Sequence, residues 1–320
     1  MISFKEMEDI TKKFSERTLH GEGIFGAVYE GTRLDGEEMT VIKLKEHRRP
    51  SESQFKQVVN GLRFEHRNIL QLKGYCSEII GPESKSKEKS GVEVRERLLC
   101  YEYLQNGSLD RKIFGDQLPL SWEERYRIIQ DICQVLKYLH EECKDAPQVH
   151  MGITPGNIWL DNEMLPKVGC CGLSRFFAAD PTQIYNTEVV GSWGYIAPEH
   201  IELTKISSKS DIYSLGVLII EIVTGDKCPS NENGSAASFI AKVRQSWQNN
   251  SHIAKQYPLL DDICIQQVKG CIKIGGRCTE IMPDKRPTAG EIVPMLAEEC
   301  TKKPGFWNAF CSGICSVDRL

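Results

Sequence analysis

The sequence has little net charge and no long hydrophobic run. Its 40 Lys and Arg residues are balanced by 44 Asp and Glu residues, which leaves a formal net charge of -4. It therefore lacks the basic character of proteins that bind nucleic acid or anionic membranes. The most apolar stretch, 215–223, is too short to span a bilayer and contains Glu221. The first residues hold neither the glycine needed for myristoylation nor an apolar signal core, so secretion is not expected.

Cysteine is not scarce, but its 13 copies follow no paired spacing. An odd count without paired spacing disfavours a disulfide framework and zinc knuckles, and it favours a reduced, intracellular chain. Cys264, Cys271 and Cys278 recur every seven residues, which predicts buried packing along one helix face. No histidine joins them at metal-ligand spacing. Three others near the end are either free thiols on a tail or sites of acylation: Cys300, Cys311 and Cys315.

Residue patterns divide the chain into a sheet-rich first third and a helical remainder. Glycine-punctuated runs of β-forming residues over 19–44 predict consecutive antiparallel strands. Residues 77–97, rich in Lys, Glu and Ser, predict a mobile surface insertion between strands. From Trp122 onward apolar residues recur every three or four positions, and Ser121 with Glu124 matches a capping box. Residues 211–224, followed by Gly225, predict a buried helix.

A glycine motif, GxGxxGxV, spans residues 21–28. GxGxxG alone is weak support for any one fold, because dinucleotide-binding domains carry it too. There the last glycine opens a helix, whereas here residues 27–31 continue as a strand. This context favours a hairpin whose backbone amides approach phosphates, and it makes Gly21, Gly23, Gly26 and Val28 candidate nucleotide-binding residues.

Further motifs follow in a fixed order: VIK ending at Lys43, HRNIL at 66–70, YEYLQNGSL at 101–109, APE at 197–199 and RPT at 286–288. With them the sequence resembles plant receptor-like kinases, relatives of the interleukin-receptor-associated kinases, over residues 14–299. The resemblance implies an α+β bilobal protein kinase-like fold, with an antiparallel sheet and one helix in the N-lobe and a mainly helical C-lobe. Its expected bounds are 1–104 for the N-lobe, 105–300 for the C-lobe and 301–320 for a tail.

The resemblance also implies roles for single residues. Lys43 would be the strand lysine of the nucleotide site, Tyr101 the gatekeeper, and the backbone of Glu102 and Leu104 the hinge that meets an adenine ring. Scaffold roles are implied for Asp211, which would anchor the catalytic loop, and for a pair in the second lobe, Glu199 and Arg286.

The acids that phosphoryl transfer needs are missing. In the segment that corresponds to HRDxxxxN, residues 150–157, Gly152 replaces the catalytic Asp and only Asn157 remains. Cys170 replaces the Asp of the DFG motif, and a thiol is a poor ligand for magnesium. Counting back from His66 puts either Gln57 or Val58 where the helix Glu should pair with Lys43. We therefore predict no catalytic residue and no magnesium site, and we expect Lys43 to lack its usual ionic partner, the helix Glu.

Nucleotide binding is expected to be weak. By the resemblance, Val41 and Trp159 stand where smaller residues cover adenine from above and below. Our hypothesis is that the Trp159 indole occupies part of that pocket and helps to hold the lobes together. In the alternative, it turns into the lobe core and leaves the pocket open. ATP remains the candidate cofactor.

The sequence thus predicts a pseudokinase that acts as an intracellular signalling scaffold or allosteric regulator, as in plant defence. The alternative is a receptor-like serine/threonine kinase that binds ATP and retains low, non-standard phosphotransfer. Expected partners are other protein kinases or receptor kinases, in the cytoplasm or, through a partner, at the inner face of the plasma membrane. Three residues of the activation segment are candidate phosphate acceptors: Thr182, Thr187 and Ser192.

Overall fold

The structure is a computed structural model of the chain. The structure describes residues 1–23, 26–45, 51–80, 94–115, 119–143, 147–171, 173, 189, 191–229 and 236–301. The chain divides into two compact units. Unit 1 comprises Met1–Ser108 with Asn157–Gly191, and unit 2 comprises Leu109–Gly156 with Ser192–Leu320.

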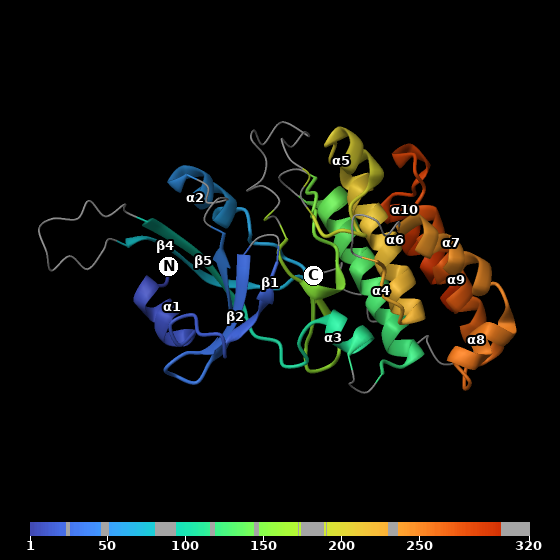
Figure 1. Cartoon of the computed structure of the whole chain (residues 1–320), viewed down its shortest axis with the longest axis horizontal. Helices are drawn as coiled ribbons and strands as arrows, with labels where there is room; N and C mark the ends of the chain where they lie inside the picture. The colour runs from blue at the N-terminus through green and yellow to red at the C-terminus, as the bar shows by residue number, and fades with distance from the viewer. Residues whose placement is uncertain are drawn as a thin grey trace, which may run out of the picture. The chain divides into compact units, whose positions relative to one another are not determined.

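Unit 1 is built on a five-stranded antiparallel sheet with the strand order β1-β2-β3-β5-β4 (Figure 1). Its strands are β1 Leu19–Glu22, β2 Gly26–Thr32, β3 Glu38–Leu44, β4 Leu72–Ile80 and β5 Val94–Glu102. A second, two-stranded sheet pairs β6 Ile158–Leu160 with β7 Pro166–Val168. The predicted antiparallel strands over 19–44 are confirmed.

Two helices cover opposite faces of the large sheet (Figure 1). Helix α1, Phe4–Ile10, buries Met7 and Ile10 in a cluster with Met39 and Val41 of β3. Helix α2, Glu52–Asn60, packs from the other side, where the Phe55 ring lies 5.8 Å from the ring of Tyr75. We refer to these as the α1 face and the α2 face. The sequence predicted one helix in this part of the chain, so α1 is an addition.

The predicted insertion was too long at both ends. Residues 77–80 belong to β4 and residues 94–97 to β5, and the two strands pair from Ser77 opposite Arg97 to Ile80 opposite Val94. The remainder, 81–93, lies outside the described residues.

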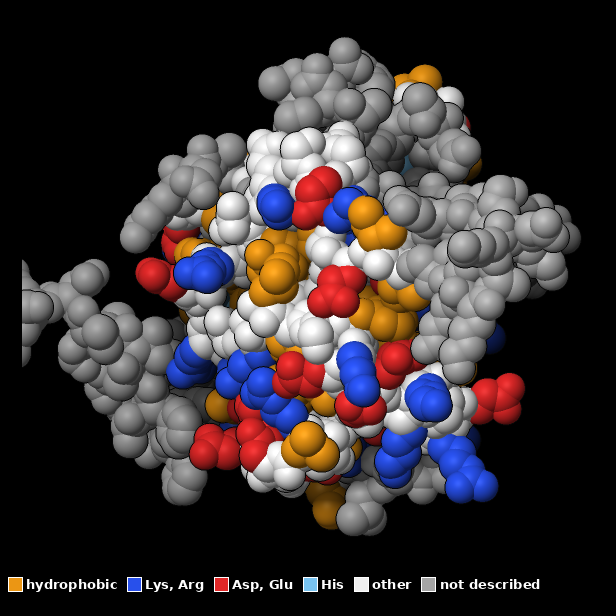
Figure 2. Space-filling view, turned by 90° about the vertical axis from the view of Figure 1, so that its left-hand side faces the viewer, with side chains coloured by type: hydrophobic (Ala, Val, Ile, Leu, Met, Phe, Trp, Pro, Cys, Tyr) orange, Lys and Arg blue, Asp and Glu red, His pale blue; other side chains and the backbone are white. Residues whose placement is uncertain are grey.

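Lys and Arg side chains are interspersed with Asp and Glu side chains on the face shown in Figure 2.

Unit 2 is helical around the buried helix α6, Ser208–Thr224. Gly225 caps this helix with φ 73°, as its sequence position predicted. Helix α6 lies against α9, Asp262–Cys278, where a Cβ on Gly216 would come within 2.8 Å of the Gly275 carbonyl oxygen. The other helices are α3 Leu109–Phe114, α4 Trp122–Lys137, the π-helical turn Tyr138–Glu142, α5 Pro198–Leu203, α7 Ala236–Ser246, α8 Asn250–Gln256 and α10 Ala289–Thr301.

Local signals in this unit were read correctly. Ser121 and Glu124 form the capping box that starts α4. Cys264, Cys271 and Cys278 are all buried on α9.

Of the described helices, none combines the length and apolar character needed to cross a membrane. Cys311, Cys315, Thr182 and Thr187 lie outside the described residues, whereas Ser192 is described and exposed.

Candidate functional site

The glycine motif forms a hairpin, as predicted. Gly21 lies in β1 and Gly26 begins β2, and the Gly23 amide donates to the Gly26 carbonyl over 2.9 Å. Gly26 must be glycine, because a Cβ there would lie 2.1 Å from the Lys43 carbonyl oxygen. A strand follows the last glycine, so the helix of a dinucleotide-binding fold is excluded at this position.

Lys43 does not lie on the same sheet face as Val28. Val28 of β2 is directly opposite Ile42 of β3, and directly opposed residues share a face. Successive residues of a strand alternate between faces, so Val28 and Ile42 point to the α2 face and Lys43 to the α1 face. The structure therefore does not bring Lys43 to the nucleotide-facing set in which the sequence placed it.

On the α1 face, Lys43 has a carboxylate partner. Its Nζ lies 3.3 Å from Glu96 Oε1 of β5 and 4.6 Å from the centre of the Phe14 ring. The carboxylate that pairs with Lys43 thus comes from a neighbouring strand and not from helix α2, where the usual partner was expected to be missing. The ion pair and the cation–π contact both hold the lysine away from the α2 face.

On the α2 face, the residue next to Lys43 on β3 and one of the two candidate helix residues are apolar. Ile42 is 4% exposed and Val58 of α2 is 6% exposed, whereas Gln57 points to solvent. Of the two alternatives for the helix position, Val58 is thus the one that faces inward. Replacing a buried ion pair by apolar residues costs a fold little, which explains how the packing of α2 persists without the pair. Thr40, and not Val41, shares this face, because Val41 packs in the α1 cluster.

Helix α2 is tied to the sheet by a different carboxylate, Glu52. Its Oε2 accepts hydrogen bonds from Ser77 Oγ at 2.7 Å and from Arg95 Nη1 at 2.8 Å. The hydrogen bond from Ser77, with the charges of Lys56 and Arg95, lowers the pKa of Glu52. The first turn of α2 is therefore anchored to β4 and β5, and not to β3, the strand that carries Lys43.

In unit 2, the loop that should carry the catalytic acid is well supported. Asp211 accepts hydrogen bonds from the amides of His150 (2.6 Å) and Met151 (2.8 Å), and its Oδ2 lies 2.9 Å from His140 Nε2. The predicted anchoring role of Asp211 fits these contacts. Gly152 follows, buried, with its amide donating to His150 Nδ1 over 3.1 Å. The loop is thus held in place, but it has no side chain at the position of the acid.

Cys170 does not suit magnesium. Burial raises the pKa of its thiol to about 12, so the sulfur is neutral at physiological pH. The thiol points to Asn157 Oδ1, 3.9 Å away. Magnesium prefers oxygen ligands, with carboxylates prominent among them, and a neutral thiol supplies neither charge nor oxygen. Within the described ranges, no group of three or more His, Cys, Asp and Glu side chains is arranged to hold a metal.

The segment expected to form the hinge borders a cavity that is lined by acidic residues. Leu104 lines a cavity of about 400 Å³ that also presents the side chains of Glu38, Asp161 and Glu163. The amide of Glu102 is already used, donating to the Gln71 carbonyl over 3.2 Å. Three carboxyl groups beside Leu104 disfavour a polyphosphate at this hollow.

The hydroxyl group of Tyr101, the expected gatekeeper, is buried and makes no hydrogen bond within the described part of the chain. Tyr101 is 3% exposed, and among the described residues its hydroxyl has no hydrogen-bond partner. Burial raises the pKa of Tyr101, with Cys170 and Cys171 nearby. An unpaired buried hydroxyl costs free energy.

Tyr101→Phe is therefore expected to stabilise the protein by about 1 kcal/mol, because it removes that hydroxyl and keeps the ring. Urea unfolding measures the change. Tyr126→Phe is the matched control, since the Tyr126 hydroxyl donates to the Leu296 carbonyl over 2.6 Å and its loss should destabilise. A loss of stability in Tyr101→Phe would contradict the assignment.

Trp159 lies against β1. Its side chain is 6% exposed, and its ring centre lies 4.7 Å from that of His20, next to Gly21 of the hairpin. Nδ1 of His20 is paired with Glu30 of β2. The sequence gave no reason to single out His20, which contacts Trp159, or Glu30, which holds His20.

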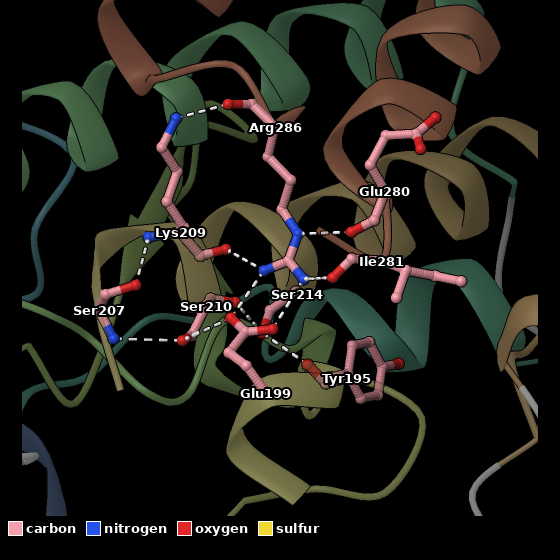
Figure 3. A network of polar contacts seen from close by, with 9 residues as sticks. All are labelled: Tyr195, Glu199, Ser207, Lys209, Ser210, Ser214, Glu280, Ile281 and Arg286. Carbon is pink, nitrogen blue, oxygen red and sulfur yellow. Dashed lines mark hydrogen bonds and ion pairs between the residues drawn. The ribbon is translucent and has the colours of Figure 1, made fainter. Parts of the chain in front are cut away.

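The predicted scaffold pair of unit 2 is present (Figure 3). Arg286 donates two hydrogen bonds to Glu199, over 2.8 Å and 2.7 Å, and further ones to backbone carbonyls of Lys209, Glu280 and Ile281. Ser210 Oγ adds a contact of 3.1 Å to Glu199. This network links α5, α6 and the segment before α10.

The model of the protein kinase domain family matches residues 14–296. Similar curated proteins include cysteine-rich receptor-like protein kinases 8 and 6 of Arabidopsis thaliana, each 33% identical over 316 residues, which cover 96% of this chain and 44% of theirs. Cysteine-rich receptor-like protein kinase 27 of the same plant is 33% identical, with 100% of this chain and 49% of that protein covered. The chain spans less than half the length of these relatives.

Among solved structures, the pseudokinase domain of BIR2, an immune regulator of the RLK/Pelle family, is similar with a TM-score of 0.74. The two sequences are 22% identical, and the match covers 97% of this chain and 89% of the other. The predicted α+β kinase-like fold is thereby confirmed.

Proposed function

The chain belongs to the protein kinase domain family, and we propose that it serves as a pseudokinase, a signalling scaffold or allosteric regulator that transfers no phosphate. The observation that carries this proposal is the loss of both acids: Gly152 has no side chain and Cys170 is a buried, neutral thiol. Loss of a positioned general base alone costs about a hundredfold to ten-thousandfold in rate. Loss of the metal ligand adds to that.

The position of Lys43 on the α1 face supports the same conclusion. A lysine paired with Glu96 on the α1 face is not available to phosphates that would approach Val28 on the α2 face. ATP binding is accordingly proposed to be weak or absent, with Gly21, Gly23, Gly26, Val28, Glu102, Leu104 and Asn157 as the residues left to meet it.

Partners are proposed from the relatives. The similar curated proteins are receptor-like kinases, and the similar structure is the pseudokinase domain of an immune regulator. We therefore propose that this chain binds another protein kinase or a receptor kinase in plant defence signalling, in the cytoplasm or beside the plasma membrane. Capture of receptor-kinase domains by the purified chain, with Arg286→Ala as a destabilised control, tests this.

Phosphotransfer is tested with labelled ATP and magnesium on a generic peptide, with an active kinase assayed in parallel. We expect incorporation at the level of the protein-free control, since neither the metal nor the hydroxyl has a carboxylate to hold it. Incorporation that rises with protein and disappears in Asn157→Ala would favour the alternative, a kinase with a non-standard mechanism.

A further inference from the structure

Two aromatic rings from separate sheets of unit 1 meet beside the glycine hairpin. Trp159 of β6 and His20 of β1 lie with ring centres 4.7 Å apart and planes tilted by 39°. His20 lies at the register shift between Leu19, opposite Tyr29, and Gly21, opposite Val28, and its imidazole is held by Glu30, two residues beyond Val28 on β2. Since Val28 and Glu30 are two positions apart on one strand, they share a sheet face. The ring pair therefore lies on the side of the sheet where a nucleotide would be expected.

The indole also lies near Gly169, the residue that follows β7. Ile158 and Leu160, its neighbours on β6, are fully buried and point to the opposite side of the strand, so Trp159 is the β6 side chain on the His20 side. A Cβ added to Gly169 would stand 3.5 Å from Trp159 Cδ1, which is ordinary van der Waals contact. With 6% of its surface exposed, the indole has contacts toward both sheets. A close-packed site of this kind has no room for a second ring system.

We propose that Trp159, held by His20, takes the place of a purine base and is the residue that excludes nucleotides from this chain. The inference rests on the proposed function and gives it a cause: the base site is filled by the protein's own side chain. An indole and a purine are both flat, two-ring systems of similar size, so each can fill the same gap between a strand above and a strand below. The alternative, an indole turned into the core with an open pocket, does not fit its contact with β1.

The test uses the full chain and adenosine, a probe that needs neither magnesium nor a phosphate-binding lysine. Wild-type protein is expected to show no binding by calorimetry at millimolar adenosine. Trp159→Leu keeps an apolar residue on β6 and vacates the ring space, and it should bind adenosine at least about tenfold more tightly than wild type. Trp159→Phe vacates less space and should gain less.

Trp247 supplies the matched control. It is 3% exposed in unit 2 and also contacts a histidine, His252, with ring centres 5.2 Å apart. Trp247→Leu should lose similar packing but gain no affinity for adenosine. Equal gains in both leucine variants would mean that adenosine binds generic cavities, which overturns the proposal.

Two other outcomes overturn it. One is wild-type protein that binds adenosine in the calorimeter, a measurement that does not depend on any variant folding. The other is a Trp159→Leu or Trp159→Phe protein that unfolds cooperatively yet gains no affinity. Either result leaves the loss of phosphotransfer untouched, because that loss rests on Gly152 and Cys170 and is measured with labelled ATP.

Discussion

Replacing Arg286 with alanine is expected to lower the free energy of unfolding by about 3–5 kcal/mol, because it leaves a buried carboxylate without its partner. Arg286 is 1% exposed and Glu199 is 7% exposed. Burial of Glu199 raises the pKa of its carboxyl group, but the hydrogen bonds and charge of Arg286 outweigh burial, so the pKa of Glu199 is lowered overall. The carboxylate is thus kept ionised by the group that the mutation removes. Chemical denaturation at neutral pH measures the loss.

A surface pair provides the control. Arg33 contacts Glu6 over 2.8 Å, with both side chains 36% exposed. Arg33→Ala should cost far less than Arg286→Ala, because exposed ion pairs contribute little to stability. Arg286→Lys should be intermediate, because one ammonium cannot reproduce the forked contact to Glu199 and the three carbonyl contacts. A loss in Arg286→Ala as small as that in Arg33→Ala would mean that the network adds little to stability.

Elements set by short-range signals could be predicted from the sequence. The capping box at Ser121 and the glycine stop at Gly225 each depend on residues within one helical turn. The seven-residue recurrence of cysteines on α9 needs only the helical period. The motifs that identified the fold are likewise contiguous, which is why the kinase-like architecture followed from them.

The face on which a strand residue lies could not be predicted in the same way. A shift of one residue along β3 exchanges Lys43 for Ile42 on the α2 face, and spacing counted from a motif does not separate neighbours. The pairing of Val28 with Ile42 decides it, and pairing is a property of two strands together. The helix position had the same ambiguity between Gln57 and Val58, which burial resolves.

Partners far apart in sequence were also missed. Glu96 reaches Lys43 only because β5 lies beside β3, and Glu96 itself fell within a segment predicted to be a loop. His20 and Trp159 are 139 positions apart in the sequence, and no local pattern marks such a contact. Missing acidic residues can be recognised in the sequence itself, whereas contacts between residues that are far apart in the sequence require the structure.

Unfolding free energy is expected to fall as pH rises from about 4.5 to about 7 because of one buried carboxyl group, Glu221 of α6. Glu221 is 0% exposed, accepts the Tyr195 hydroxyl over 2.6 Å and accepts the Cys228 amide over 2.8 Å. Burial raises the pKa of Glu221 from 4.5 to about 7, although the two hydrogen bonds and the charge of Lys227 oppose it.

The direction follows from proton counting. Between these two pKa values the folded protein holds a proton on Glu221 that the unfolded chain has released, so raising the pH favours unfolding. One pKa unit corresponds to about 1.4 kcal/mol, so the full effect above the folded-state pKa is about 3 kcal/mol. Below pH 4.5 the carboxyl group is protonated in both states and the penalty vanishes.

Glu221→Gln isolates this group, because other carboxylates such as Glu199 shift stability in the opposite direction and are common to both proteins. An amide keeps an acceptor for the Cys228 amide and cannot ionise. The difference in unfolding free energy between Glu221→Gln and wild type should therefore grow in favour of the variant, by about 3 kcal/mol from about pH 4.5 to about pH 8. Urea unfolding at several pH values measures it. A difference that stays constant across this range would show that Glu221 is ionised at the same pH in the folded and unfolded states, and burial would then not be the dominant influence on this carboxyl group.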